Sequence, residues 1–126
     1  MFQISKEQIT YLQRKRALEL VPRFIEELCE QGVVDQSQWN LEDLHVDTVV
    51  QIESALRIGL SSGRDVMGFL QLRHLLGTGF ENLPEINQEL NTPTQPEGWR
   101  VFGMMLSFES EYWITARDRV AMYNKP

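Results

Sequence analysis

The side chains best suited to chemistry are few and far apart in this sequence. It has two histidines, His45 and His74, and one cysteine, Cys29. Neither histidine has a second histidine four residues away, the spacing at which two imidazoles on one helix reach the same metal ion. Cys29 lacks the nearby basic residue that marks a reactive thiolate. These residues therefore indicate neither a metal centre nor a cysteine nucleophile.

The acidic residues do not form a catalytic pair either. Asp43, His45 and Asp47 alternate along the chain, and on a helix each step of two residues turns the side chain by about 200°. Glu109 and Glu111 diverge for the same reason, so the paired carboxylates of acid–base catalysis are not indicated. The sequence contains no glycine-rich phosphate loop and no Gly-x-Ser-x-Gly elbow. We predict a protein that is not an enzyme and has no catalytic, metal or cofactor site.

The composition is typical of a folded protein with one domain. The chain has 126 residues, of which 42% are hydrophobic, and this is enough to build a core without disulfide or metal support. Its single cysteine excludes an internal disulfide and fits a reducing compartment. No segment has the length and apolarity of a signal peptide or a membrane span. We expect a single helical domain over residues 1–126, located in the cytoplasm, with no membrane partner.

The net charge is −6, and the acidic excess lies in the middle of the chain. Residues 32–60 carry one basic and five acidic side chains. This charge repels the phosphates of nucleic acids and favours a basic surface on a protein partner. A solvated acidic face that keeps the protein soluble explains the same residues. We expect no nucleic-acid partner.

Local signals predict a long first helix. Ser5 and Gln8 have the spacing of a capping box, and apolar residues at helical intervals follow them. Pro22 removes a main-chain donor, so we expect this helix to be kinked or broken near Val21. The basic run at residues 14–16 is interpreted as a solvated face or, alternatively, as a phosphate site.

A connector with an anchoring Trp39 separates this helix from a central helical hairpin. The first helix of the hairpin begins at His45 and ends at Gly59, and the serine pair 61–62 caps the second. The same stretch has the layout of a DNA-binding helix-turn-helix. Asp65, near the start of the second helix, would repel phosphate, and we therefore favour a plain antiparallel hairpin.

The chain ends in a segment with many apolar residues. A short helix beginning at Pro84 and a proline-rich loop at residues 91–98 precede it. We predict one helix from Trp99 to about Tyr123 that is apolar over much of its circumference. Such a helix is either central to the core or shared with a partner. The partner-binding candidates are Trp99, Phe102, Met104, Met105, Phe108, Tyr112 and Trp113.

These periodicities together predict the fold class. No segment alternates at a period of two for long enough to indicate a sheet. We therefore predict an all-α, single-domain bundle of about five helices. Its parts are a long kinked N-terminal helix, a central helical hairpin and a long apolar C-terminal helix.

Several short stretches of the sequence carry a family resemblance. They are Ile4-Ser5-Lys6-Glu7-Gln8, Gly59-Leu60-Ser61-Ser62-Gly63-Arg64-Asp65-Val66, Phe69-Leu70, Leu76-Gly77-Thr78-Gly79-Phe80 and Pro84. On these residues the chain resembles a group of small helical proteins that are typically encoded beside spike proteins and effectors of bacterial type VI secretion systems. The stretch from Trp99 to Trp113 departs from that group.

The resemblance implies a cytoplasmic accessory protein of the co-chaperone or adaptor type. It would bind a secreted effector, or the effector's larger adaptor, for loading on the secretion spike. The alternative is an immunity protein that binds and neutralises a cognate toxin, and a second alternative is a helix-turn-helix DNA-binding regulator. The first two functions need a protein partner and no active site. The oligomeric state does not follow from the sequence.

Overall fold

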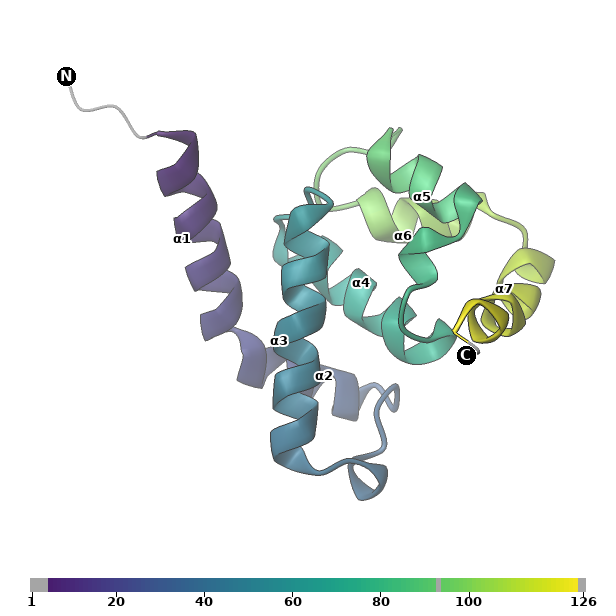
Figure 1. Ribbon diagram of the computed structural model, residues 1–126, viewed down its shortest axis with the longest axis horizontal. Coiled ribbons are helices and arrows are strands. Elements are labelled where there is room, and N and C mark those ends of the chain that lie inside the picture. Colours follow the sequence, from purple (N-terminus) through teal and green to yellow (C-terminus); the bar gives the residue numbers. More distant parts are fainter. Residues whose placement is uncertain (1–4, 93, 125–126) are drawn as a thin grey trace.

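A computed structural model describes residues 5–92 and 94–124, and over these residues the protein is all-helical, without strands (Figure 1). The α-helices are α1 (Lys6–Glu19), α2 (Val21–Glu30), α3 (Leu41–Arg57), α4 (Gly63–Leu76), α5 (Pro84–Asn91), α6 (Arg100–Ser107) and α7 (Ser110–Tyr123). Two 3₁₀ turns, η1 (Gln36–Gln38) and η2 (Phe80–Asn82), lie between them. The all-α class is confirmed, but the described residues form seven helices instead of about five, because two predicted helices are each broken in two. In this part of the chain no helix is long and apolar enough to cross a membrane.

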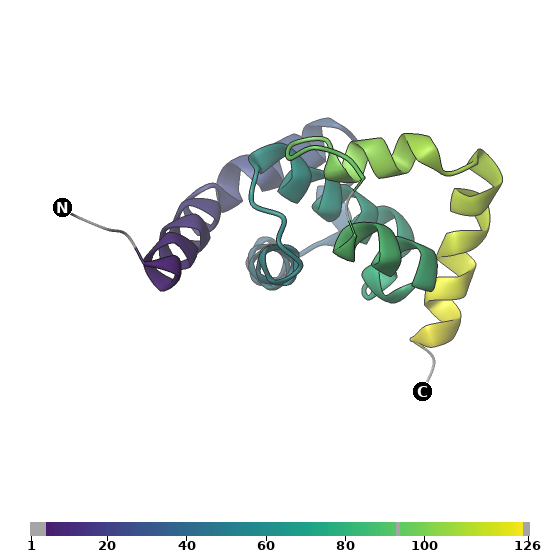
Figure 2. The same cartoon turned by 90° about the horizontal axis from the view of Figure 1, so that it is seen from above.

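Pro22 separates α1 from α2. The predicted capping box forms, since the Gln8 N–H donates to Ser5 Oγ at 3.1 Å and the Ser5 N–H donates to the Gln8 side chain at 2.8 Å. Pro22 lies in the first turn of α2, where its missing N–H leaves no helical hydrogen bond unmade. The predicted kink or break is therefore a break. Side chains at residues 5–16 are all exposed, and α1 extends from the rest of the molecule, opposite α7 (Figures 1 and 2).

The central hairpin forms as predicted, and its second helix is the centre of the core. α4 packs against α3, α6 and α7. Gly59 ends α3 with a φ of +96°, a conformation that favours glycine, and the N–H of buried Leu60 donates to the Ala55 carbonyl at 3.1 Å. The first helix of the hairpin begins four residues earlier than expected, because Asn40 caps the main-chain N–H groups of its first turn. Apolar side chains at helical spacing along α4 are buried; they are Val66, Phe69, Leu70 and Leu76.

Two charged side chains fix α6 against this hairpin. The carboxylate of Asp65 is fully buried and accepts hydrogen bonds from the main-chain N–H groups of Gly98, at 2.7 Å, and Val101, at 3.2 Å. Arg100 donates to the main-chain carbonyls of Gly59, at 2.9 Å, and Leu90, which lie at the C-terminal ends of α3 and α5. A carboxylate at a helix start and a guanidinium at two helix ends both satisfy main-chain groups that the helices leave unpaired. Asp65 and Arg100 therefore set the position of α6.

The prediction of a single C-terminal helix is wrong, because the segment forms two helices, α6 and α7. Phe108 and Glu109 adopt extended backbone conformations, and the chain turns a corner between α6 and α7. Each shorter helix buries one narrow stripe, which consists of Val101 and Met104 on α6 and of Ala116 and Val120 on α7. At the corner, the indole N–H of Trp113 donates to the main-chain carbonyl of Met105 at 3.1 Å. The corner lets one apolar segment cover two sides of the core, which a straight helix could not do.

Candidate partner-binding groove

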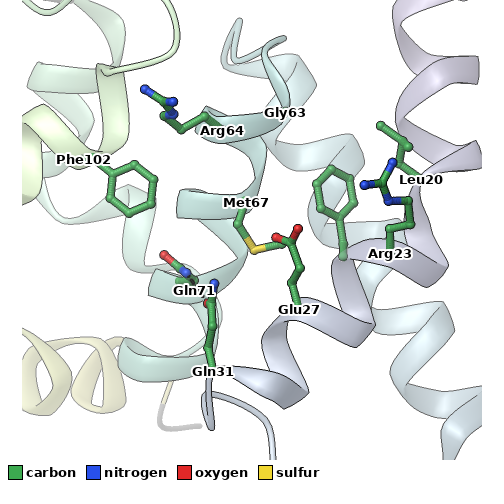
Figure 3. Close-up of a pocket in the computed structure, with 10 residues that line it drawn as sticks. Leu20, Arg23, Glu27, Gln31, Gly63, Arg64, Met67, Gln71 and Phe102 are labelled. Atoms are coloured by element: carbon green, nitrogen blue, oxygen red, sulfur yellow. Dashed lines mark hydrogen bonds between the residues drawn. The ribbon is translucent and has the colours of Figure 1, made fainter.

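A hollow of about 440 Å³ lies between α2, α4 and α6 (Figure 3). Its floor is apolar: Met67 from α4 and Phe24 from α2 are nearly buried, with 6% and 7% of their surfaces exposed. Phe102, a predicted partner-binding residue, points toward the hollow from the side of α6 (Figure 3). An apolar floor between helices is a common setting for a bound ligand or peptide. This hollow, together with the second hollow that adjoins it and is described below, is called the groove.

Helical spacing aligns the side chains that border the groove. Arg64 and Gln71 lie three residues before and four residues after Met67, and all three line the hollow from one face of α4. Along α2 and at its C-cap the bordering residues recur at intervals of four; they are Arg23, Glu27 and Gln31. A hydrogen bond from the Gln71 amide to the Gln31 amide oxygen spans the groove at one end. The rim is therefore polar and the floor apolar.

The groove continues past α2 toward α1. A second hollow of about 350 Å³ shares Leu20, Phe24 and Gly63 with the first. Arg16 from α1 and Glu97 from the loop before α6 border this extension. The two adjoining hollows are together lined by residues of four helices, α1, α2, α4 and α6.

The outward side of α6 carries an apolar row beside the groove. Trp99 and Leu106 are 50% and 84% exposed, and with Phe102 they have the spacing of one helix face. The Arg64 guanidinium lies over the Trp99 ring, 4.5 Å from its centroid. Leu106 was not among the predicted partner-binding residues. Its spacing relative to Trp99 and Phe102 was the signal that it shares their outward face.

The structure divides the seven predicted partner-binding residues into three groups. Trp99 and Phe102 lie beside the groove. Met104 is fully buried beneath α6, where it is part of the core. The remaining four are partly buried at the corner between α6 and α7; they are Met105, Phe108, Tyr112 and Trp113. One continuous helix was expected to carry all seven, and the break in that helix separates them.

The three rings at the corner contact one another. The Phe108 ring centroid is 4.7 Å from that of Tyr112 and 5.5 Å from that of Trp113. Arg119 donates to both carboxylate oxygens of Glu85 at 3.1 and 3.2 Å, and these bonds hold the pKa of Glu85 below its ordinary value. Burial raises the pKa of Tyr112, and the nearby charge of Glu85 raises it further. These contacts describe a packed corner that supports α6.

The histidines and acidic residues considered as candidates for catalysis or metal binding are either far apart or engaged in packing contacts and ion pairs. His74 meets Trp39 edge to face at 5.7 Å, and its neighbour Arg73 forms a partly buried ion pair with Asp47 at 2.7 Å. Burial lowers the pKa of His74, Arg73 lowers it further, and Asp47 offsets part of this. Asp43 and His45 are exposed on α3. Within residues 5–92 and 94–124 no three His, Cys, Asp or Glu side chains are placed to hold a metal ion.

Comparison with known proteins gives no match, whether against protein-family models, curated proteins or solved structures.

Proposed function

We propose that this protein is a binding protein whose groove receives a segment of another protein. The observation that supports this is an apolar row beside a depression with Met67 at its floor: Trp99 and Leu106 are exposed, and Phe102 between them is half-buried. An exposed apolar row next to a concave apolar surface is typical of protein-binding sites. Large aromatic side chains at such places contribute much of the binding energy.

The proposed role is that of a cytoplasmic accessory that binds a type VI secretion effector, or its adaptor, for loading on the spike. The resemblance of the central stretches supports this role, and so does a groove that needs no catalytic group. An immunity protein that neutralises a toxin would use the same kind of surface. A helix-turn-helix regulator has less support, because α4, which would read DNA, is packed against three other helices.

Co-purification tests the binding function. The tagged protein and its Phe102→Glu variant would each be expressed with the products of the genes adjacent to its own. We expect one of these products to co-purify with the unmodified chain and to be reduced about ten-fold or more with Phe102→Glu. Ile114→Glu is the matched control, because Ile114 is 72% exposed on α7 and does not line the groove. Equal losses with both variants would contradict binding at the groove.

A deletion strain separates loading from immunity. If the protein loads an effector, deleting its gene stops secretion of that effector without harming the cell. If it is an immunity protein, the deletion strain dies and inactivating the toxin rescues it. Intact secretion together with normal growth would contradict both roles.

A further inference from the structure

We infer that the groove takes an amphipathic helix of a protein partner, and that acidic residues flank the apolar stripe of this helix. The inference rests on the proposed function and adds the chemistry of the partner. It follows from the shape of the groove, from the charge of its rim and from the contacts that the groove's two acidic side chains make.

The shape favours a helix. The two hollows of about 440 and 350 Å³ share three lining residues and therefore adjoin each other, and their combined lining extends from α6 across α4 and α2 to α1. Figure 3, which draws the first hollow, shows Met67 near the middle of that hollow, with Phe102 on one side and Arg23 and Leu20 on the other. Apolar residues recurring every three or four positions along a partner helix would contact such a floor, while the other faces of that helix stay in water.

The charge of the rim favours carboxylates. Arg23 and Arg64 border the first hollow from opposite sides, and Arg16 borders the second (Figure 3). All three are exposed, and none forms a salt bridge with another described residue. A guanidinium binds a carboxylate with two parallel hydrogen bonds, which makes arginine well suited to this recognition.

Two acidic residues also border the groove, and they do not cancel this preference. Glu97 already accepts a hydrogen bond from the Ser61 hydroxyl at 3.0 Å. Glu27 follows Arg23 by one helical turn without forming an ion pair with it. Three arginines against two glutamates give the groove a net charge of +1, in a chain whose total is −6. The basic partner surface that the acidic middle of the sequence favours is therefore not what this groove would select.

A second copy of the chain is a poor occupant of the groove. Among the described helices α1 has the largest share of exposed side chains, and another copy could insert it. It carries four basic and two acidic residues, a net charge of +2. Its insertion would place like charges beside the three arginines, which is unfavourable.

Selection from a peptide library tests this inference without knowledge of the natural partner. A displayed library of helical peptides would share one apolar stripe and carry Glu, Lys or Ser at the flanking positions. Selected against the full chain, it should become enriched in Glu at these positions. A synthetic Glu-flanked peptide should then bind at least about ten-fold more tightly than its Lys-flanked counterpart, followed by tryptophan fluorescence.

Charge reversal provides the control. Arg23→Glu combined with Arg64→Glu should invert the preference toward Lys-flanked peptides. Arg57→Glu combined with Arg117→Glu changes the net charge equally at exposed positions outside the groove and should leave the preference unchanged. Helical circular dichroism of each variant confirms that it is folded.

Three results would overturn the inference: enrichment in Lys, no enrichment of any helix, or a DNA duplex that competes with the selected peptide. The outcome is separable from that of the proposed function. If co-purification depends on Phe102 but selection favours no acidic helix, the groove binds a partner of other chemistry. If selection succeeds and co-purification fails, the recognition chemistry is right and the partner lies elsewhere in the genome.

Discussion

Asp65 is the residue whose substitution tests the packing of α6 most directly. Its fully buried carboxylate accepts two main-chain hydrogen bonds, from Gly98 and from Val101. Asp65→Ala removes both acceptors. The Val101 N–H is then buried without a partner, whereas that of Gly98 is partly exposed and can bond to water.

The magnitude follows from these two bonds. A hydrogen bond to a charged group contributes about 1.5–3 kcal/mol, and an unpaired buried N–H costs about 1–3 kcal/mol. We therefore expect Asp65→Ala to lower the free energy of unfolding by about 3 kcal/mol, a large part of the stability of an ordinary domain. Asp65→Asn keeps one acceptor oxygen but turns an N–H₂ toward the second donor, so about half of that loss is expected.

Urea unfolding followed by circular dichroism measures these differences, and the melting temperature of Asp65→Ala should fall by about 10 °C. Ser62→Ala provides a scale. Its hydroxyl only accepts from the Asp65 N–H at the start of α4, and its loss should cost about 1 kcal/mol. An effect of Asp65→Ala no larger than that of Ser62→Ala would refute the reasoning.

Three further substitutions test the packing at Gly68, the titration of His74 and the hydrogen bond of Trp113. A Cβ added at Gly68 would lie 2.7 Å from Val101 Cγ1. Gly68→Ala should therefore lower the free energy of unfolding by about 1–3 kcal/mol and the melting temperature by several degrees. Gly63 has open space around it, so the control Gly63→Ala should change the free energy of unfolding by less than about 0.5 kcal/mol. His74 has a folded-state pKa below its ordinary value of 6.5, so the unfolded chain binds more protons and the unfolding free energy should fall as the pH drops below about 7. This slope should flatten in His74→Gln, and an unchanged slope would mean that His74 is not its source. Trp113→Phe removes the indole donor to a main-chain carbonyl of α6 and should cost about 1 kcal/mol, with a weaker near-ultraviolet dichroism signal as the check on the corner.

The first half of the fold was predictable because its signals are local. The capping box at Ser5, the proline at residue 22 and the glycine that ends α3 each act within one helical turn. The corner at Phe108 has no such signal. No glycine or proline stands between Ser107 and Ser110. At this corner Trp113 donates to the main-chain carbonyl of Met105, a contact between two helices that no local pattern in the sequence marks.

The candidate site was predictable in part for the same reason. Trp99 and Phe102 are close in sequence and share a helix face, so their spacing identified them. The residues that complete the groove come from other helices: Arg23 from α2 and Met67 from α4. Their proximity to Phe102 is a property of tertiary packing and has no signature in the sequence.

Photo-crosslinking from position 102 tests the central claim, that a partner protein lies in the groove. The photoreactive residue p-benzoylphenylalanine would replace Phe102 in living cells, and in a control strain it would replace Ile114. We predict a covalent adduct from position 102 with the product of an adjacent gene, joined through an acidic amphipathic helix, and none from position 114. If the complex forms but crosslinks from position 114 and not from position 102, the groove is not where the partner binds.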